Sequence, residues 1–201
     1  MTPLTYALLA ANLAMFVLET QLGNTFLTPL VLWPLGAGFH LWQPLTSAFL
    51  HGNVAHLATN MFALWMFGRP VERALGSGRF LALYSASLAT AAATQLLVTS
   101  LLPDKVPTLG ASGAVFGVLA AFAVLYPNRK VMLLFPPIPM PARVFVFLYA
   151  LLELFAGVTG TMPGIAHFAH LGGLVGGVAL LRYWRRRDQD RAALPRDGGW
   201  R

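Results

Sequence analysis

One hydroxyl group stands out in this sequence because of the small residues around it. Ser112 lies in the stretch Gly110-Ala-Ser-Gly-Ala-Val-Phe-Gly117, at the start of an apolar run. Glycine and alanine fill a core poorly, but they let another backbone or a substrate come close. A serine at a helix start is more often an N-cap than a nucleophile, so Ser112 needs a partner before it indicates any chemistry.

His170 is the first candidate partner for this hydroxyl. It lies on a helical stripe with Gly173 and Gly177, a small face that lets a neighbouring helix approach closely. Gly113 and Gly117 offer a similar face beside the serine. Two such helices can bring a serine hydroxyl within about 3 Å of an imidazole.

A second pair of polar residues could stabilise developing negative charge. His56 and Asn60 are four residues apart and therefore share one helix face. Their imidazole and amide groups supply the fixed N–H donors that an oxyanion needs. His51 and His167 lie close to these residues in the sequence. They are candidates for support of the same site, or for helix–helix hydrogen bonds alone.

The composition indicates the environment in which these residues work. The chain is 57% hydrophobic and 10% charged, whereas a soluble domain carries about 25% charged residues. We therefore predict an all-α polytopic membrane protein, with residues 1–201 forming a single membrane domain. The absence of cysteine excludes disulfides, thiolate catalysis and cysteine-ligated metals.

Six apolar runs approach membrane-spanning length and predict a six-helix bundle. They are Leu4–Leu22, Asn53–Gly68, Phe80–Leu101, Ser112–Tyr126, Ala142–Gly160 and Ile165–Trp184. The first run lacks a basic leader and a clear cleavage site, so we expect a retained helix. The connection Gly23–Gly52 is apolar and suits the membrane interface or a loop packed on the bundle, and a polar turn is expected over residues 69–79.

The positive charges predict the orientation of the bundle. Six spans place both termini on one side, and assigning that side to the cytoplasm puts 13 of the 14 Lys and Arg residues there, with Lys105 outside. Half of the Lys and Arg residues crowd the C-terminus: Arg182 is followed by six more arginines in the basic tail 185–201. After an apolar helix, such a tail indicates a cytoplasmic anchor facing anionic lipid rather than a nucleic-acid site. We therefore expect a multi-pass protein of the cell membrane.

This topology places the candidate residues at one depth. The fourth span has 15 residues, which extend about 22 Å against a hydrocarbon core of about 30 Å. Ser112 then starts below the outer surface. His56, Asn60 and His170 also occur early in spans that enter from outside. Polar residues at membrane depth are costly and usually face a cavity.

Three motifs resemble those of one family, the rhomboid intramembrane serine proteases. They are Gly110-Ala-Ser-Gly-Ala, His56-x-x-x-Asn60 and Ala169-His-Leu-Gly-Gly, and the stretch Val71-Glu-Arg-Ala-Leu-Gly-Ser-Gly-Arg-Phe80 is similar to the family's second connection. The likeness covers about residues 40–184, in order and across all the motif-bearing spans.

The resemblance implies a function and a role for each matching residue. Ser112 would be the nucleophile and His170 its general base. His56, Asn60 and the Ser112 backbone amide would form the oxyanion hole. The substrates would be single-span membrane proteins, cleaved near the outer membrane face without any cofactor, metal or nucleic acid. A substrate helix would enter near the second and fifth spans and unwind there.

The resemblance also implies supporting roles and shows two departures. Phe116 matches a position whose aromatic ring packs on the catalytic imidazole, although many members have tyrosine there. Gly110 would leave room for the substrate backbone. In the first connection the chain has Trp42-Gln43 where the family often has Trp-Arg, so the hydrogen bonds of an arginine are missing. Glu153 and Glu19 match no motif beside His170, and we therefore expect a Ser–His dyad without a carboxylate.

Two other classes of function fit parts of the sequence. The first is a metal site in a transporter or metalloenzyme, built from His51, His56, His167 and His170. Against it, the sequence has no His-Glu-x-x-His and shows no carboxylate beside these histidines. The second is a non-catalytic scaffold of the same fold. The intact set of Ser112, His170, His56 and Asn60 argues against that alternative.

Overall fold

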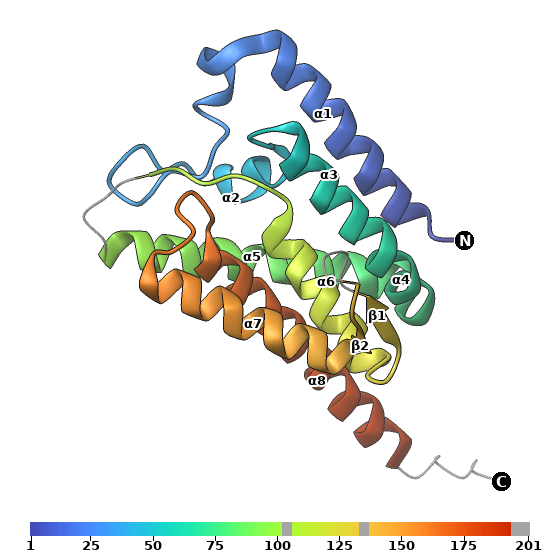
Figure 1. Cartoon of the computed structure of the whole chain (residues 1–201). Coiled ribbons are helices and arrows are strands. Elements are labelled where there is room, and N and C mark those ends of the chain that lie inside the picture. Colours follow the sequence, from blue (N-terminus) through green and yellow to red (C-terminus); the bar gives the residue numbers. More distant parts are fainter. Residues whose placement is uncertain (102–105, 133–136, 194–201) are drawn as a thin grey trace, which may run out of the picture.

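The computed structural model describes residues 1–101, 106–132 and 137–193 as a mostly helical bundle (Figure 1). Residues 102–105, which include Lys105, residues 133–136 and the tail beyond residue 193 lie outside the described residues. The main helices are α1 (Pro3–Leu27), α3 (Val54–Ala63), α4 (Arg69–Leu75), α5 (Ser77–Leu101), α6 (Ser112–Leu125), α7 (Ala142–Thr159) and α8 (His167–Ala193). Two short helices, α2 (Gln43–Thr46) and η1 (Ser47–Phe49), precede α3.

Each predicted span coincides with helix, and three helices are long and apolar enough to cross a membrane on their own. They are Pro3–Gly23 within α1, Ser77–Leu101 and Ala142–Thr159. The apolar helix α6 is shorter. These helices make the chain an integral membrane protein.

The polar turn predicted over residues 69–79 is wrong for most of its length. A π-helical turn, η2 (Leu64–Gly68), joins α3 directly to α4. The helix continues to Leu75 and ends at Gly76, whose φ of 78° is unfavourable for other residues. Asn53 caps the start of α3, because its side chain accepts a hydrogen bond from the His56 backbone N–H.

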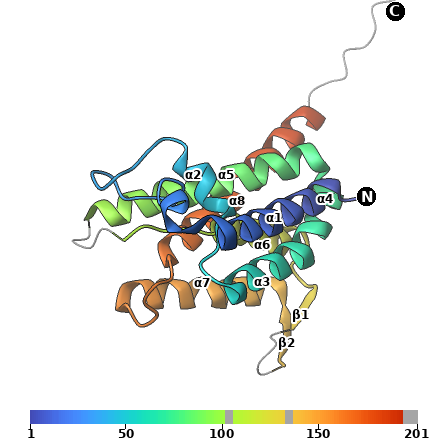
Figure 2. The ribbon, with the colours of Figure 1, turned by 90° about the horizontal axis from the view of Figure 1, so that it is seen from above.

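The prediction of an all-α fold misses one small sheet. Strands β1 (Lys130–Met132) and β2 (Pro139–Pro141) pair antiparallel between α6 and α7, and they project from the bundle in Figure 2. Prolines 139 and 141 lie in β2, which has a single partner strand, and an edge strand tolerates residues without an N–H.

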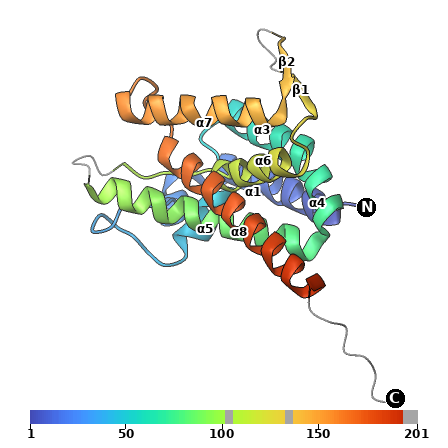
Figure 3. The same cartoon turned by 90° about the horizontal axis from the view of Figure 1, so that it is seen from below.

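Two contacts show which helix ends lie together. Arg79 at the start of α5 forms an ion pair of 2.9 Å with Asp188 near the end of α8. The carboxylate of Glu72 in α4 accepts a hydrogen bond from the hydroxyl of Thr5 in α1. The N-terminus, α4 and the end of α8 therefore share one end of the bundle, as Figures 1 and 3 show.

The core of the bundle is α6, which is buried along most of its length and contacts α3, α5, α7 and α8. Its contact with α8 depends on glycine. A Cβ on Gly173 would overlap the carbonyl oxygen of Gly113, and one on Gly177 would lie 2.7 Å from that of Gly117. The two helices thus meet backbone to backbone, as their small faces predict.

Candidate active site

Ser112 and His170 meet at the end of the bundle opposite to the N-terminus. Ser112 begins α6, His170 lies in the first turn of α8, and the Ser112 Oγ is 2.8 Å from the His170 Nε2. The imidazole is buried. A serine hydroxyl that donates to an imidazole nitrogen at this distance is arranged for transfer of its proton.

The ring of Phe116 fixes the plane of this imidazole. The two rings are parallel within 6°, and their centroids are 4.3 Å apart. Tyr149 of α7 packs against Phe116, with 4.9 Å between ring centroids. Phe116 therefore packs between Tyr149 and the His170 imidazole.

A carboxylate lies on the far side of the imidazole, contrary to the expected dyad. The Glu153 Oε2 is 2.9 Å from the His170 Nδ1 and 2.7 Å from the His167 Nδ1. All three residues are buried. The expectation of no carboxylate failed because Glu153 reaches His170 across the α7–α8 interface, which a one-dimensional motif does not show. A buried acidic residue in an apolar helix was the available signal.

The same cluster corrects the argument used above against a metal site. Glu153, His167 and His170 offer three ligand atoms that lie within 4.8 Å of one another. In this structure both Nδ1 atoms are at hydrogen-bond distance from the Glu153 Oε2, and the His170 Nε2 faces Ser112. An ion would have to displace these hydrogen bonds, so the arrangement matches a hydrogen-bonded site better than a metal centre.

His56 lies beside the serine, and Gly110 makes room for it. A Cβ on Gly110 would lie 2.8 Å from both the Cε1 and the Nε2 of His56. The small residue at position 110 thus accommodates the imidazole. Gly110 also has a φ of 126°, a conformation that L-residues with side chains rarely adopt.

Asn60 and His51 are buried near His56 with unpaired polar atoms. Asn60 lies one turn further along α3, and its Nδ2 has no hydrogen-bond partner within the described part of the chain. The ring of His51 contacts the ring of His56 edge to face, with centroids 5.1 Å apart. Burial, followed by the charge of His56, lowers the pKa of His51 to about 4, so His51 is neutral at physiological pH.

The segment that carries Ser112 is tied to the long first connection. Leu32 and Thr108 exchange two backbone hydrogen bonds of 2.9 Å, and the Gly110 N–H donates to the Ser47 carbonyl. Gln43 is fully buried in this connection. Its Oε1 accepts from the Trp33 and His40 N–H groups, and its Nε2 donates to the Gly38 and Pro29 carbonyls. Without an arginine at this position we expected such hydrogen bonds to be missing. Gln43 instead supplies hydrogen bonds that link separate parts of the connection.

A cavity of about 40 Å³ adjoins Ser112, with Ser47, Gln95 and Thr108 among its lining residues. One water needs roughly 10–15 Å³ of such volume, so the cavity has room for solvent beside the hydroxyl.

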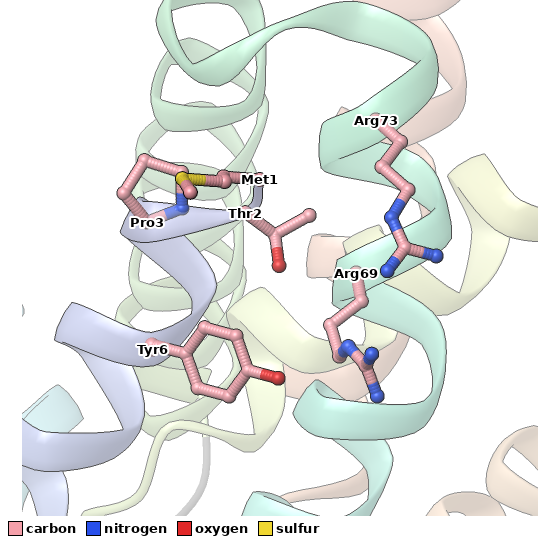
Figure 4. A pocket seen from close by; sticks show the side chains of 6 residues that line it. All are labelled: Met1, Thr2, Pro3, Tyr6, Arg69 and Arg73. Carbon is pink, nitrogen blue, oxygen red and sulfur yellow. The ribbon is translucent and has the colours of Figure 1, made fainter.

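A larger hollow of about 310 Å³ lies at the opposite end of the bundle (Figure 4). It is lined by Met1, Thr2, Pro3, Tyr6, Arg69 and Arg73. The Arg69 guanidinium lies over the rings of Tyr6 and Trp65, at 5.8 and 5.1 Å from their centroids. This hollow contains neither the serine nor a histidine, so it is separate from the site at Ser112.

The fold and the site together define a class of protein: an integral membrane protein in which a half-buried serine meets a buried histidine between helices. The family model for the Rhomboid domain matches residues 38–187. The chain belongs to the rhomboid family, as its motifs predicted.

Three relatives illustrate the similarity. The chain is 35% identical over 180 residues to the Rhomboid protease GluP of Bacillus subtilis, covering 86% of this chain and 33% of the relative. It is 37% identical over 179 residues to Rhomboid protein 1, mitochondrial, of Saccharomyces cerevisiae, covering 87% and 51%. It is 30% identical over 191 residues to the Rhomboid protease GlpG of Serratia proteamaculans, covering 92% and 63%. The chain thus spans less than two thirds of the length of each.

Proposed function

We propose that this chain is an intramembrane serine endopeptidase that cleaves the transmembrane segments of single-span membrane proteins near the outer membrane face. The observation that carries the proposal is the 2.8 Å contact between the Ser112 Oγ and the His170 Nε2 inside a bundle of membrane-length helices. Family membership and the names of two relatives as rhomboid proteases support it.

In this mechanism Ser112 attacks the carbonyl carbon of the scissile peptide bond. His170 takes the serine proton at its Nε2 as the oxygen–carbon bond forms, which gives a tetrahedral intermediate. When the carbon–nitrogen bond breaks, His170 returns the proton to the leaving amine, and Ser112 is left acylated. Water from the cavity beside Ser112 then hydrolyses the ester, with His170 again as the base.

The oxyanion of the intermediate needs N–H donors that are already in position. We assign this role to His56, Asn60 and the Ser112 backbone amide. The position of His56 beside Gly110 supports the assignment. So does the Asn60 Nδ2, a buried donor without a partner among the described residues. The N-terminus of α6 adds a positive dipole end behind Ser112.

We further propose that the chain spans the plasma membrane six times. Both termini would then lie in the cytoplasm. The second span is α3 with η2, and the sixth is the apolar part of α8. The distribution of Lys and Arg in the sequence supports this orientation. Cysteine accessibility tests it, because the chain has no native cysteine. Single cysteines at the exposed positions Ala74 and Thr161 should react from opposite sides, with Ala74 on the cytoplasmic side.

The protease activity is tested with the full chain reconstituted in proteoliposomes together with a single-span substrate. The wild type should cut the substrate, and Ser112→Ala should leave it intact while keeping a wild-type melting temperature. A fluorophosphonate should label Ser112 covalently, and both Ser112→Ala and His170→Ala should lose the label.

Undiminished cleavage by Ser112→Ala would overturn the proposal. Cleavage that survives in Ser112→Ala but is lost with a chelator would support the metalloenzyme alternative, and the absence of both cleavage and labelling would support the scaffold.

A further inference from the structure

One buried carboxylate is not needed for a serine–histidine dyad, yet it lies against the catalytic histidine. Glu153 is in α7, between apolar residues that face outward. Burying a carboxylate costs free energy unless hydrogen bonds or an opposite charge compensate for it. At Glu153 two imidazoles provide this compensation through a single carboxylate oxygen.

The contact with Glu153 selects one tautomer of His170. A carboxylate only accepts hydrogen bonds, so the His170 Nδ1 must carry a proton to bond with it at 2.9 Å. The Nε2 of neutral His170 is then an unprotonated acceptor, and it faces the Ser112 hydroxyl at 2.8 Å. This is the tautomer that can take the serine proton.

The contacts of His167 require a further proton at the carboxylate. The His167 Nε2 lies 3.1 Å from the Met162 carbonyl, which is an acceptor, so this nitrogen carries a hydrogen. The His167 Nδ1 lies 2.7 Å from the Glu153 Oε2. A proton must therefore lie between these two atoms, either on the imidazole or on the carboxyl group. His167 and Glu153 share that proton, and the bond fixes the carboxylate where His170 needs it.

We propose that Glu153 is a positioning residue that completes a Ser112–His170–Glu153 triad, and that His167 holds the Glu153 carboxylate in place. The inference rests on the proposed protease function. When His170 accepts the serine proton it becomes a cation, and the adjacent Glu153 oxygen stabilises that cation through the Nδ1–H bond. Substrate binding does not involve Glu153, because its contacts are on the side of His170 away from Ser112.

The test compares Glu153→Gln with Glu72→Gln in the reconstituted full chain. Gln keeps the size of the side chain and an acceptor oxygen but removes the charge. Glu153→Gln should lower kcat by about 10²-fold, the range for a lost contribution to acid–base catalysis, with KM unchanged. It should slow fluorophosphonate labelling of Ser112 to a similar degree.

Glu72 is also buried and hydrogen-bonded, but it lies at the opposite end of the bundle. Glu72→Gln should therefore lower stability and leave kcat unchanged.

Two variants of His167 test its part in the cluster. The amide nitrogen of Asn lies about where the Nδ1 of histidine does, so His167→Asn should keep the bond to Glu153 and a kcat close to wild type. His167→Ala should lower kcat, with the melting temperature as the control for folding. If His167→Asn and His167→Ala retain equal, wild-type rates, the holding role is wrong.

The outcomes separate this inference from the proposed function. If Ser112→Ala is inactive and Glu153→Gln keeps the wild-type kcat and labelling rate, the protease stands and the triad is overturned. If Ser112→Ala remains active, the protease proposal itself fails. If Glu153→Gln unfolds, the labelling rate of folded Glu153→Asp decides. A rate equal to that of the wild type, despite the shorter reach, contradicts the positioning role.

Discussion

The phenyl ring of Phe116 lies flat against the imidazole of His170, with planes 6° apart and ring centroids separated by 4.3 Å. Phe116 follows Ser112 by one helical turn on α6, so the same helix carries the hydroxyl and the surface that orients its partner. His170 is thereby constrained on three sides: by Ser112 at Nε2, by Glu153 at Nδ1 and by Phe116 on its face.

Replacing this ring should affect the rate more than the fold. Phe116→Leu keeps an apolar side chain but removes the flat surface. The loss of an aromatic pair amounts to about 0.5–1.5 kcal/mol, which corresponds to roughly a 2- to 10-fold decrease in the rate of Ser112 labelling. Phe116→Tyr keeps the ring and should label at a rate close to wild type. Equal labelling rates for the leucine and tyrosine variants would show that the stacking has no part in the reaction.

Gly110→Ala should disturb His56 directly. The added Cβ would lie 2.8 Å from two atoms of the His56 ring and would force alanine to adopt a φ of 126°. A strained backbone conformation costs about 1–3 kcal/mol, so both the melting temperature and the cleavage rate should fall. Gly78→Ala is the matched control, because a Cβ there meets nothing within 4 Å.

A double-mutant cycle separates the clash from the backbone strain. Adding His56→Ala to Gly110→Ala removes the ring but not the strained φ. The double variant should therefore be more stable than the sum of the two single effects predicts, measured by thermal unfolding in detergent. Strict additivity would mean that His56 moves away without cost.

Gln43→Ala should loosen the first connection. The variant removes the side-chain partner of the Trp33 and His40 N–H groups and of the Gly38 carbonyl, whereas the Pro29 carbonyl keeps a hydrogen bond from the Trp42 indole. Each unsatisfied buried group costs about 1–3 kcal/mol where water cannot enter, so we expect a loss of about 2–4 kcal/mol after relaxation. Gln21 is exposed on α1, and Gln21→Ala should change the stability by less than about 0.5 kcal/mol. An unchanged unfolding midpoint in Gln43→Ala would contradict the cross-linking role.

The stability of the bundle should fall at low pH through Glu72. Burial alone would raise the pKa of this carboxyl group, but hydrogen bonds from the Thr5 and Ser77 hydroxyls and from the Thr5 and Leu4 amides hold it below its usual value. The resulting stabilisation is present above the unfolded-state pKa of about 4.3. It is lost as the pH falls through the lower folded-state pKa, because the unfolded chain then binds more protons.

Unfolding midpoints measured from pH 7 to pH 3 test this prediction. The wild type should lose stability below about pH 4.3, whereas Glu72→Gln should start lower and lose less over the same range. Parallel curves for the two proteins would assign the acid sensitivity to other groups.

The helices of this protein were predictable because each membrane-length apolar run has few alternatives to helix. The start of α6 was predictable to the residue, because Gly110 and the small residues after it mark the boundary. Family membership followed from the order of the motifs. The turn after the second span was misread because charged residues at 69–79 resemble a loop in composition, although residues 69–75 continue the helix. The hairpin was missed because prolines usually argue against strands.

The carboxylate partner of His170 illustrates a different limit. Glu153 and His170 are 17 residues apart and lie on separate helices, so their contact depends on the rotation of α7 about its axis. The apolar residues around Glu153 do not define that rotation, since both faces of α7 are hydrophobic in sequence. By contrast, the glycines of α6 and α8 predicted their mutual contact, because small residues on one stripe indicate a close neighbour.

The two hydrogen bonds of His170 differ in how firmly they are anchored. Ser112 and His170 lie on helices whose backbones touch at glycine, and a Cβ on Gly173 would already overlap Gly113. Glu153 lies on α7, whose outer face exposes Phe147, Leu151, Phe155 and Val158. An outward displacement of α7 would therefore stretch the Glu153 bond first, while the serine and the imidazole stay together. The hydrogen bond that selects the tautomer of His170 thus depends on how closely α7 packs against α8.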